Sequence, residues 1–225
     1  MKSLARVCKH FIGYSIGSSE NTEVVRSLLN TFDEKKLSFA ENILCVLDGS
    51  KSLERAVTDK FGEKVFIQRC KIHKLRNIYS KIPKKYYTEF KNRYDKIFTC
   101  NKFEDAKKEL ESVSKWLSEI SYSAKESLEE AGEKLITLQK IGMPGELMRS
   151  FNTTNLIESA FSAPKCSLRR VKKWNLESDM LDRWISISLL YQEKRFRKVK
   201  GVNSLNLFIH KFTKPNFNVD LEKIA

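Results

Sequence analysis

The sequence predicts an α/β protein whose sheet is interrupted by an all-α insertion, and three observations lead to this fold class. Patterns typical of strands and of helices alternate along residues 9–69. Charged helical patterns without a convincing strand then fill residues 71–140, up to the break IGMPG at 141–145. Further helical patterns follow that break. Alternation of this kind predicts a parallel or mixed sheet with helices on its faces, so we interpret residues 71–140 as an insertion into that core.

Three strands and two helices are expected in the first part of the chain. The strands are KHFIGYSIG at 9–17, ILCVL at 43–47 and KVFIQR at 64–69. The helices, at 20–37 and 51–60, place apolar residues at helical spacing: Val24, Val25, Leu28, Leu29 and Phe32 in the first, and Leu53, Ala56 and Val57 in the second. All remaining elements are expected to be helices, at 71–81, 84–98, 102–120, 123–140, 155–163, 176–196 and 203–211.

The composition indicates a folded and strongly basic protein. The chain has 225 residues, of which 41% are hydrophobic, and a net charge of +14. A basic surface favours nucleic acid or acidic substrates, although a general preference for lysine would also produce it. No apolar run approaches the ~20 residues of a membrane helix, and we expect no signal peptide. Five cysteines, an odd count without framework spacing, favour free thiols in a reducing compartment, and hence the cytoplasm.

Asp48 and Gly49 end the apolar run of residues 43–47 abruptly. Sites in open α/β sheets gather at the carboxyl ends of strands, and a carboxylate there suits a hard cation such as Mg²⁺. The alternative is that Asp48 caps the following helix while Gly49 makes the turn. Glu158 can likewise be a residue that projects from a helix towards the site. The alternative is a structural role, because Asn155 and Glu158 have the spacing of a helix cap and its third residue.

Cys70 and His73 form a C-x-x-H motif at the end of a predicted strand. A structural zinc site would need about two more ligands, and the remaining candidates are single and scattered: Cys100, Cys166 and His210. A Cys–His nucleophile pair would need an orienting third residue, which the sequence does not indicate.

Residues 165–200 are the most basic part of the chain. They hold eleven Lys and Arg against four acids, with aromatic residues between them. Such residues contact phosphates and stack on exposed bases. The alternative is a solvated basic helix with its aromatic residues in the core. Because they share helical spacing, we expect four apolar residues of this segment to be buried: Trp184, Ile187, Leu190 and Tyr191.

Taken together, several blocks in this order resemble the Mutator-type transposases of bacterial insertion sequences. The blocks are FIGYSIGSSENTEVVRSLL (11–29), LDGSKSLERAV (47–57), FIQRCKIHKLRN (66–77), SFNTTNLIESAF (150–161) and the basic tail from Arg169 to Gly201. The resemblance covers essentially the whole chain. It implies a ribonuclease-H-like mixed sheet whose all-α insertion precedes the last catalytic helix.

The resemblance also implies a catalytic chemistry. The family uses two aspartates and a glutamate to bind two Mg²⁺ ions, with Mn²⁺ as an alternative. Asp48 matches the second aspartate and Glu158 the glutamate, so both are expected to be catalytic metal ligands. Cys70 and His73 match a family motif whose expected role is to position the chain beside the site or the DNA. Two metals about 4 Å apart would support hydrolysis at the transposon end and then strand transfer to a target.

The expected partners are DNA, at the transposon ends and the target, and a second transposase chain, either a copy or a full-length relative. DNA contacts are expected from polar and basic residues of the matching blocks: Lys51, Arg69, Lys74, Arg76, Asn152, Asn155, Lys165, Arg169, Arg170, Lys172, Lys173, Lys194, Arg195, Arg197 and Lys198. The expected divisions are a partial catalytic core at 1–76, the all-α insertion at 77–150, and the returning catalytic helix with a basic helical part at 151–225.

One departure from the family pattern affects the expected activity. The first aspartate of the family lies on a strand just upstream of the block at 11–29, whereas residues 1–19 contain no Asp or Glu. We therefore interpret the chain as the C-terminal portion of a transposase whose first catalytic strand is missing, and expect the isolated chain to be inactive. The alternative functions are a non-catalytic remnant that binds DNA or pairs with transposase, and a basic protein without a nucleic-acid role.

Overall fold

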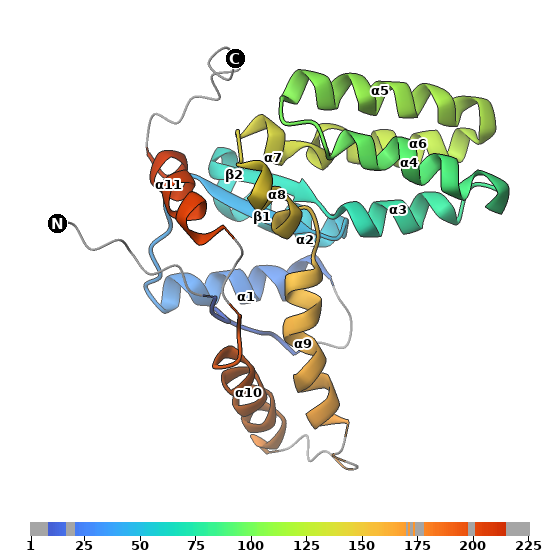
Figure 1. The fold of residues 1–225 in the computed structure, drawn as a ribbon. Helices are drawn as coiled ribbons and strands as arrows, with labels where there is room; N and C mark the ends of the chain where they lie inside the picture. Colours follow the sequence, from blue (N-terminus) through green and yellow to red (C-terminus); the bar gives the residue numbers. More distant parts are fainter. Residues whose placement is uncertain are drawn as a thin grey trace.

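A small parallel sheet lies at the centre of the fold. The computed structural model describes residues 9–16, 21–169, 171, 173, 178–197 and 201–214. Within them, β1 (Ile43–Leu47) pairs in parallel with β2 (Val65–Arg69), with Ile43 opposite Val65 and Leu47 opposite Arg69. The helix α2 (Lys51–Phe61) connects the two strands, as a parallel pair requires (Figure 1).

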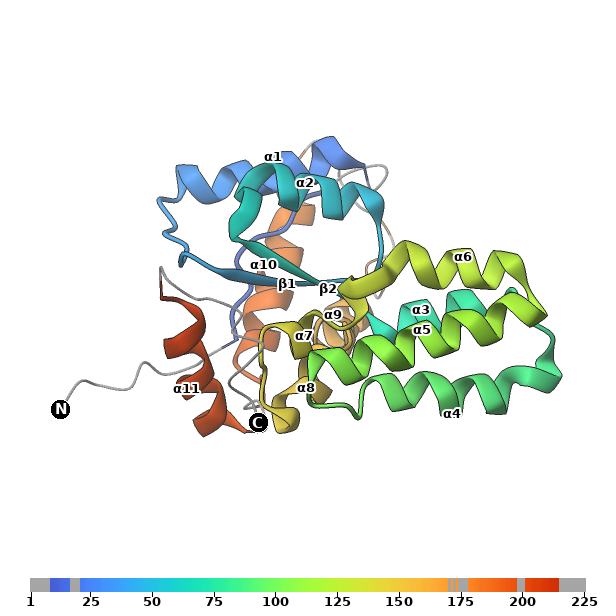
Figure 2. The same cartoon turned by 90° about the horizontal axis from the view of Figure 1, so that it is seen from above.

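Helices cover both faces of this sheet. On one face lie α1 (Thr22–Glu34) and α2, which Figure 2 shows side by side. Their apolar residues form one core cluster against Cys45 and Val65 of the strands. On the other face, α7 (Thr137–Lys140), α8 (Gly145–Phe151) and α11 (Val202–Phe212) form a second cluster that includes Leu44 and Phe66. Successive strand residues therefore point to opposite helical layers.

The insertion is a bundle with a core of its own. Its helices are α3 (Lys71–Tyr79), α4 (Tyr87–Ile97), α5 (Phe103–Ile120) and α6 (Tyr122–Ala131), joined by short turns of 3₁₀ helix at Lys84–Tyr86 and Gly132–Leu135. Phe90, Leu117 and Leu128 are completely buried in its core. One end of the bundle follows β2 directly in the chain, and the returning end is fixed to β2, since the side chain of Gln68 donates to Leu135 O and accepts from Leu138 N.

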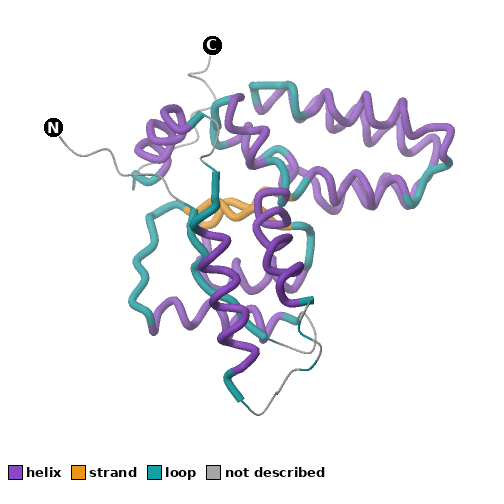
Figure 3. The backbone as a smooth tube through the Cα atoms, turned by 60° about the horizontal axis from the view of Figure 1, so that its bottom comes forward, coloured by secondary structure: helices purple, strands orange, loops and turns teal. Residues whose placement is uncertain are grey.

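Two further helices project from the sheet, as Figure 3 shows. They are α9 (Asn155–Leu168) and α10 (Met180–Glu193), which pack against each other. The extended segment 9–16 runs along them. The backbone N–H of Phe11 donates to Glu193 Oε2 at 3.0 Å, and the hydroxyl of Tyr14 donates to Asp182 Oδ1 at 2.9 Å. The Phe11 ring packs on Phe161 and Phe196, at centroid distances of 5.6 and 5.2 Å.

The structure confirms most of the expected elements and corrects others. The strand at 43–47 is confirmed to the residue, and the one at 64–69 within one residue. The strand expected at 9–17 is wrong: residues 9–16 have no strand partner among the described residues, and the backbone N–H of Phe11 donates to Glu193 of α10. Residue 17 lies outside the described part. The helix expected at 123–140 ends at Ala131, where Gly132 takes φ 49°, and α8 was not predicted. Among the described residues, no helix is both long and apolar enough to cross a membrane.

Candidate functional site at the carboxyl edge of the sheet

Asp48 and the C-x-x-H motif follow the carboxyl ends of β1 and β2, which lie at one edge of the sheet. The backbone N–H of Cys70, just after β2, donates to Leu47 O at the end of β1, at 2.7 Å. Asp48 follows Leu47 directly, so it lies beside the start of the C-x-x-H motif. Parallel strands bring their carboxyl ends to one edge, which explains why residues distant in the sequence gather here.

Asp48 closes a tight turn and does not cap the helix itself. Its Oδ1 accepts a hydrogen bond from Ser50 N at 2.9 Å. The cap of α2 is Ser50, whose hydroxyl oxygen accepts from Leu53 N at 3.3 Å. The half-buried carboxylate of Asp48 has one bond inside the turn and keeps oxygen lone pairs for another ligand.

Gly49 is the residue best suited to this turn. Its φ is +114°, a conformation that residues with a side chain rarely adopt, and a Cβ built there would lie 2.2 Å from Nη2 of Arg69. The glycine thus lets the chain turn, as expected from the sequence. The group that it leaves room for is the guanidinium of Arg69, which lies beneath the turn.

Arg69 and Lys74 are buried cations that pair with Glu130, whose side chain is 38% exposed. Arg69 donates to both carboxylate oxygens of Glu130 in α6, at 2.8 and 3.3 Å, and Lys74 donates to Glu130 Oε2 at 2.7 Å. Burial alone would raise the pKa of Glu130, but the hydrogen bonds from Arg69 and Lys74 outweigh it and lower that pKa to about 2. The pKa of Lys74 is lowered, chiefly by burial. Both cations were expected to contact DNA; in this structure they are buried and paired, which argues against that role.

The C-x-x-H motif holds the start of α9. Cys70 Sγ and His73 Nδ1 lie 3.1 Å apart. Both the backbone N–H and the hydroxyl of Thr154, just before α9, lie 3.4 Å from Cys70 Sγ, and that hydroxyl also lies 3.3 Å from His73 Nδ1. Burial would raise the pKa of Cys70, but hydrogen bonds from Thr154 and His73 leave it lowered. The motif therefore links the end of β2 to the helix that carries Glu158.

Glu158 lies in the first turn of α9 with about half of its side chain exposed. Its Oε1 accepts from the Thr154 hydroxyl at 2.8 Å and lies 3.8 Å from His73 Nε2. Asn155 was a candidate cap for this helix, but it is the first helical residue; Thr154 O already accepts from Glu158 N. Through Thr154 and Cys70, Glu158 is tied to the same sheet edge as Asp48.

The donor chemistry of this edge suits a magnesium ion only in part. Asp48 and Glu158 offer the carboxylate oxygens that Mg²⁺ prefers. No group of three or more His, Cys, Asp or Glu in the described part of the chain is arranged to hold a metal ion. A complete two-metal centre therefore needs carboxylates besides those that the described residues bring together.

The remaining expected DNA contacts fall into three groups. Asn152 is buried, and its backbone O accepts from Lys71 N at 2.9 Å, so it is a structural residue at the edge. The exposed candidates are Lys51, Arg76, Asn155, Lys165, Arg169, Lys173, Lys194, Arg195 and Arg197. Arg170, Lys172 and Lys198 lie outside the described residues.

The aromatic and aliphatic residues of α10 correct another expectation. Trp184, Ile187, Leu190 and Tyr191 were expected in the core, yet they are 43–65% exposed. Helical spacing gave the correct face of the helix, but the described residues place nothing against that face that would bury it. Arg195 lies over the Tyr191 ring, at 5.5 Å from its centroid.

Two important residues were not singled out from the sequence. Thr154 lies within the quoted block FNTTNLIESAF, where its position directly before a helix is the only sign of its role. Glu130 lies among many acids of the insertion, and its pairing with Arg69 and Lys74 depends on tertiary structure alone.

Comparison with known proteins places this α/β protein among the transposases of insertion sequences. The family described as "Transposase, Mutator family" matches residues 7–175, most of the chain, so this chain belongs to that family. Transposases of the insertion sequence IS256 in transposon Tn4001, from Staphylococcus aureus and from Enterococcus faecalis, are 30% identical over 154 residues, 67% of this chain and 37% of theirs. The transposase of IS905 from Lactococcus lactis is 27% identical over 198 residues, 87% of this chain and 48% of its own. The chain thus spans less than half the length of these relatives.

Proposed function

We propose that this chain forms part of the catalytic domain of a DNA transposase with a ribonuclease-H-like fold, in which Asp48 and Glu158 are two of the metal-binding carboxylates. The observation that supports this most strongly is the linked edge of the sheet, where Thr154 and Cys70 tie Glu158 to the strand ends beside Asp48. A bound Mg²⁺ would polarise the scissile phosphate and activate the attacking oxygen of water or of a 3′-hydroxyl.

The residues of the chain have distinct tasks in this proposal. Asp48 is held by Ser50 N, and Glu158 by the Thr154 hydroxyl, so that each carboxylate keeps a fixed orientation. Cys70 and His73 position the start of α9 and do not touch the DNA in this role. The cluster around Glu130 fixes Arg69 beneath the turn of Gly49.

The site so described is incomplete, and we propose that the isolated chain does not catalyse transposition. A two-metal centre that clamps both the attacking and the leaving oxygen needs more carboxylates than Asp48 and Glu158. The relatives are more than twice as long as the part that this chain matches in them, and the remaining ligand would come from such additional sequence.

The test is a chimera in which this chain replaces the matching part of the IS905 transposase. We expect Mg²⁺-dependent strand transfer by the chimera, and a loss of at least about 10³-fold on Asp48→Asn or Glu158→Gln. The matched control is Glu119→Gln, an exposed glutamate of α5. An active chimera that tolerates both site substitutions would disprove the assignment. Strand transfer by the isolated chain, abolished by Asp48→Ala, would contradict its proposed inactivity.

A second candidate function is DNA binding without cleavage, alone or paired with a longer transposase. It is favoured by the exposed cations after α10, Lys194, Arg195 and Arg197. The logarithm of the DNA-binding constant falls linearly with the logarithm of the salt concentration. Replacing all three cations by Gln should make this slope less steep by about 0.9 for each phosphate that they neutralise. The control replaces Lys84, Lys85 and Lys102, exposed lysines of the insertion, in the same way. An equal slope for both triple variants would exclude this surface as the DNA-binding surface.

A further inference from the structure

The first turn of α3 connects the insertion to the segment that leads into α9. Lys71, the first residue of α3, is bonded through both of its backbone polar groups. Its N–H donates to Asn152 O at 2.9 Å, shortly before α9 begins. Its carbonyl oxygen accepts a hydrogen bond from the hydroxyl of Tyr94 in α4 at 3.1 Å. One residue of α3 therefore lies between the core of the insertion and the start of the helix that carries Glu158.

Tyr94 places a hydroxyl group in the core of the bundle. The residue is only 1% exposed, and its ring packs on Phe90 and Phe98 at centroid distances of 5.3 and 5.0 Å. Burial raises the pKa of Tyr94 well above its usual range, so the hydroxyl keeps its proton and remains a donor. Phenylalanine would fill nearly the same space, so packing alone does not require the hydroxyl. What the hydroxyl adds is the bond to Lys71 O.

A second contact holds the same turn from α6. Lys74 is 3% exposed, and its Nζ donates to Ser127 O and to Glu130 Oε2, both at 2.7 Å. The turn is therefore fixed from α4 through the backbone of Lys71 and from α6 through the side chain of Lys74.

The same turn of α3 reaches Glu158 through Thr154. The Thr154 hydroxyl lies 3.3 Å from His73 Nδ1 and 3.4 Å from Cys70 Sγ, and it donates to Glu158 Oε1 at 2.8 Å. A shift of the turn would thus move the group that orients the carboxylate.

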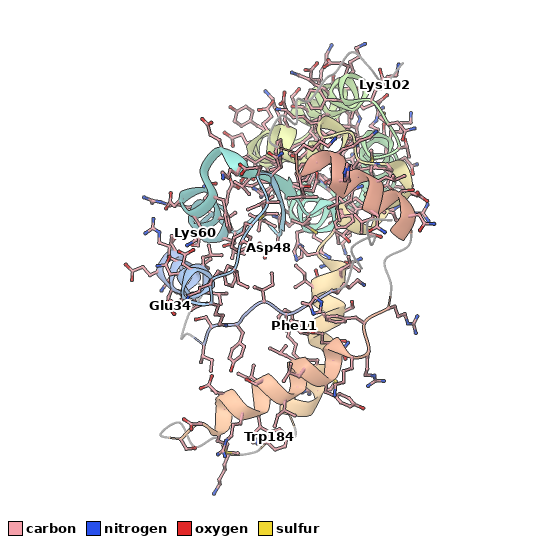
Figure 4. The ribbon with its side chains drawn as sticks, turned by 90° about the vertical axis from the view of Figure 1, so that its left-hand side faces the viewer. Phe11, Glu34, Asp48, Lys60, Lys102 and Trp184 are labelled. Carbon is pink, nitrogen blue, oxygen red and sulfur yellow. The ribbon has the colours of Figure 1, made fainter. Side chains whose placement is uncertain are left out.

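The insertion and the pair α9–α10 extend from the sheet edge in different directions. In the view of Figure 4, Lys102 of the insertion and Trp184 of α10 lie on opposite sides of Asp48. The first turn of α3 lies where these two parts join, so hydrogen bonds made in the bundle core can act on the site there.

We propose that Tyr94 is a positioning residue for Glu158, so that the insertion sets the geometry of the candidate site from within its own core. The Tyr94 hydroxyl fixes the first turn of α3, and that turn fixes the start of α9 through Asn152 and Thr154. The proposal rests on the metal-binding role proposed above for Glu158. Because a small displacement of a reacting group slows a reaction strongly, loss of the hydroxyl should slow the reaction of bound DNA without weakening DNA binding.

Hydrogen–deuterium exchange of the chain itself tests the link between α4 and α9. The amides of Ile157 and Glu158 both donate to the carbonyl group just before α9, at 2.9 Å, so they report on its first turn. In Tyr94→Phe they should exchange about fivefold faster, which corresponds to the loss of one hydrogen bond. Tyr87→Phe is the matched control, because it removes a hydroxyl that donates to Tyr79 O at 2.9 Å within the bundle. It should leave both amides unchanged.

Strand transfer by the IS905 chimera described above tests the effect on the site. Tyr94→Phe should lower the rate at saturating DNA about tenfold and leave the dissociation constant for DNA unchanged, whereas Tyr87→Phe should match the parent chimera. Combined with Thr154→Val, Tyr94→Phe should add little further loss, since both changes release the same carboxylate. Circular dichroism checks that each variant is folded.

Equal exchange of the two reporter amides in Tyr94→Phe and Tyr87→Phe would overturn the proposal, because α4 would then have no influence on α9. Weaker DNA binding at an unchanged rate, or losses that multiply in the double variant, would also overturn it, since Tyr94 would then act elsewhere than on Glu158. A chimera that tolerates Glu158→Gln disproves the metal-binding role of Glu158, whereas the exchange experiment does not depend on that role. The two failures are therefore distinguishable.

Discussion

The helical insertion carries many charged residues and β1 is apolar throughout, yet only the insertion completes its core. Phe90, Leu117 and Leu128 of the bundle are fully buried, whereas four of the five apolar residues of β1 are half-buried. A helix satisfies its own backbone and needs only one covered face. A strand at an edge leaves backbone donors and acceptors unpaired, and its burial depends on what packs against each face. The difference shows that the bundle buries its own core, while β1 is buried only in part by the described residues.

The largest expected effect is a loss of stability on truncating a buried leucine, and it should differ between the core of the bundle and the sheet. Leu128→Ala removes a fully buried side chain of the bundle and should lower the free energy of unfolding by about 3–4 kcal/mol. Leu44→Ala in half-buried β1 should cost only about 1 kcal/mol, because less apolar area leaves the core. Urea denaturation of both variants provides the measurement. Equal decreases would show that the sheet is as well packed as the bundle.

The next effect concerns the ion cluster that joins the two regions. Glu130→Gln removes the carboxylate that pairs with Lys74 and leaves Arg69 only Glu54, at 3.6 Å, so it should cost about 2 kcal/mol. Glu129→Gln, at an exposed position of the same helix, should cost less than about 0.5 kcal/mol. Similar denaturation midpoints for the two variants would contradict a structural role for the cluster.

The same cluster makes stability depend on pH. The folded-state pKa of Glu130, about 2, lies below its ordinary value of 4.5. Its contribution is therefore present above about pH 4.5 and is lost as the pH falls towards 2. The difference in unfolding free energy between wild type and Glu130→Gln should shrink over that window. A constant difference from pH 6 to pH 2 would show that the carboxylate is not the stabilising group.

An effect of similar size is expected in the turn beneath Asp48. Gly49→Ala should cost about 2 kcal/mol, because the methyl group meets the buried guanidinium of Arg69 in addition to the backbone strain. Gly62→Ala is the matched control: its φ is +57° and a Cβ there meets nothing within 4 Å. It should cost about 1 kcal/mol, from backbone strain alone, since its φ of 57° with ψ of −133° is a conformation that residues with a side chain rarely adopt. The difference in melting temperature between the two variants reports the additional steric clash of the new methyl group with Arg69.

The smallest effect should be found at the link to α9. Thr154→Val removes the hydroxyl that bonds to Glu158 and to Cys70, and should cost about 1 kcal/mol. Amide exchange in the first turn of α9 should rise with it. Thr154→Ser keeps the hydroxyl and should restore slow exchange, whereas a loss of protection equal to that of valine would refute the hydrogen-bonding role.

Local sequence patterns were enough to predict the strands and helices that have a clear apolar periodicity of their own. The apolar run ILCVL with Asp48 and Gly49 after it gave a strand and a turn at the correct residues. Helical spacing likewise gave α1, α2, α5 and α11 to within a few residues. Segment 9–16 failed because a strand is defined by a partner, and its sequence cannot say whether one is present.

The candidate site was predictable in its residues but not in its connections. The position of Asp48 after a strand, and the spacing of Cys70 and His73, are local features of the sequence. That Thr154 would join Cys70 to Glu158 depends on how α9 meets β2, across a long separation in the chain. The same limit explains Arg69 and Lys74, whose basic character predicts DNA contact until Glu130 is seen beside them.

The attachment of the insertion to a single strand has an evolutionary consequence. The chain leaves β2 at Cys70 and returns to it where Gln68 holds Leu135 and Leu138 and where the hydroxyl of Thr137 donates to Ile67 O at 2.6 Å. An excursion that starts and finishes on one strand behaves as a cassette. The turns of its helices farthest from the sheet can then change in length while Lys74, Glu130 and the acids of the sheet edge keep their places.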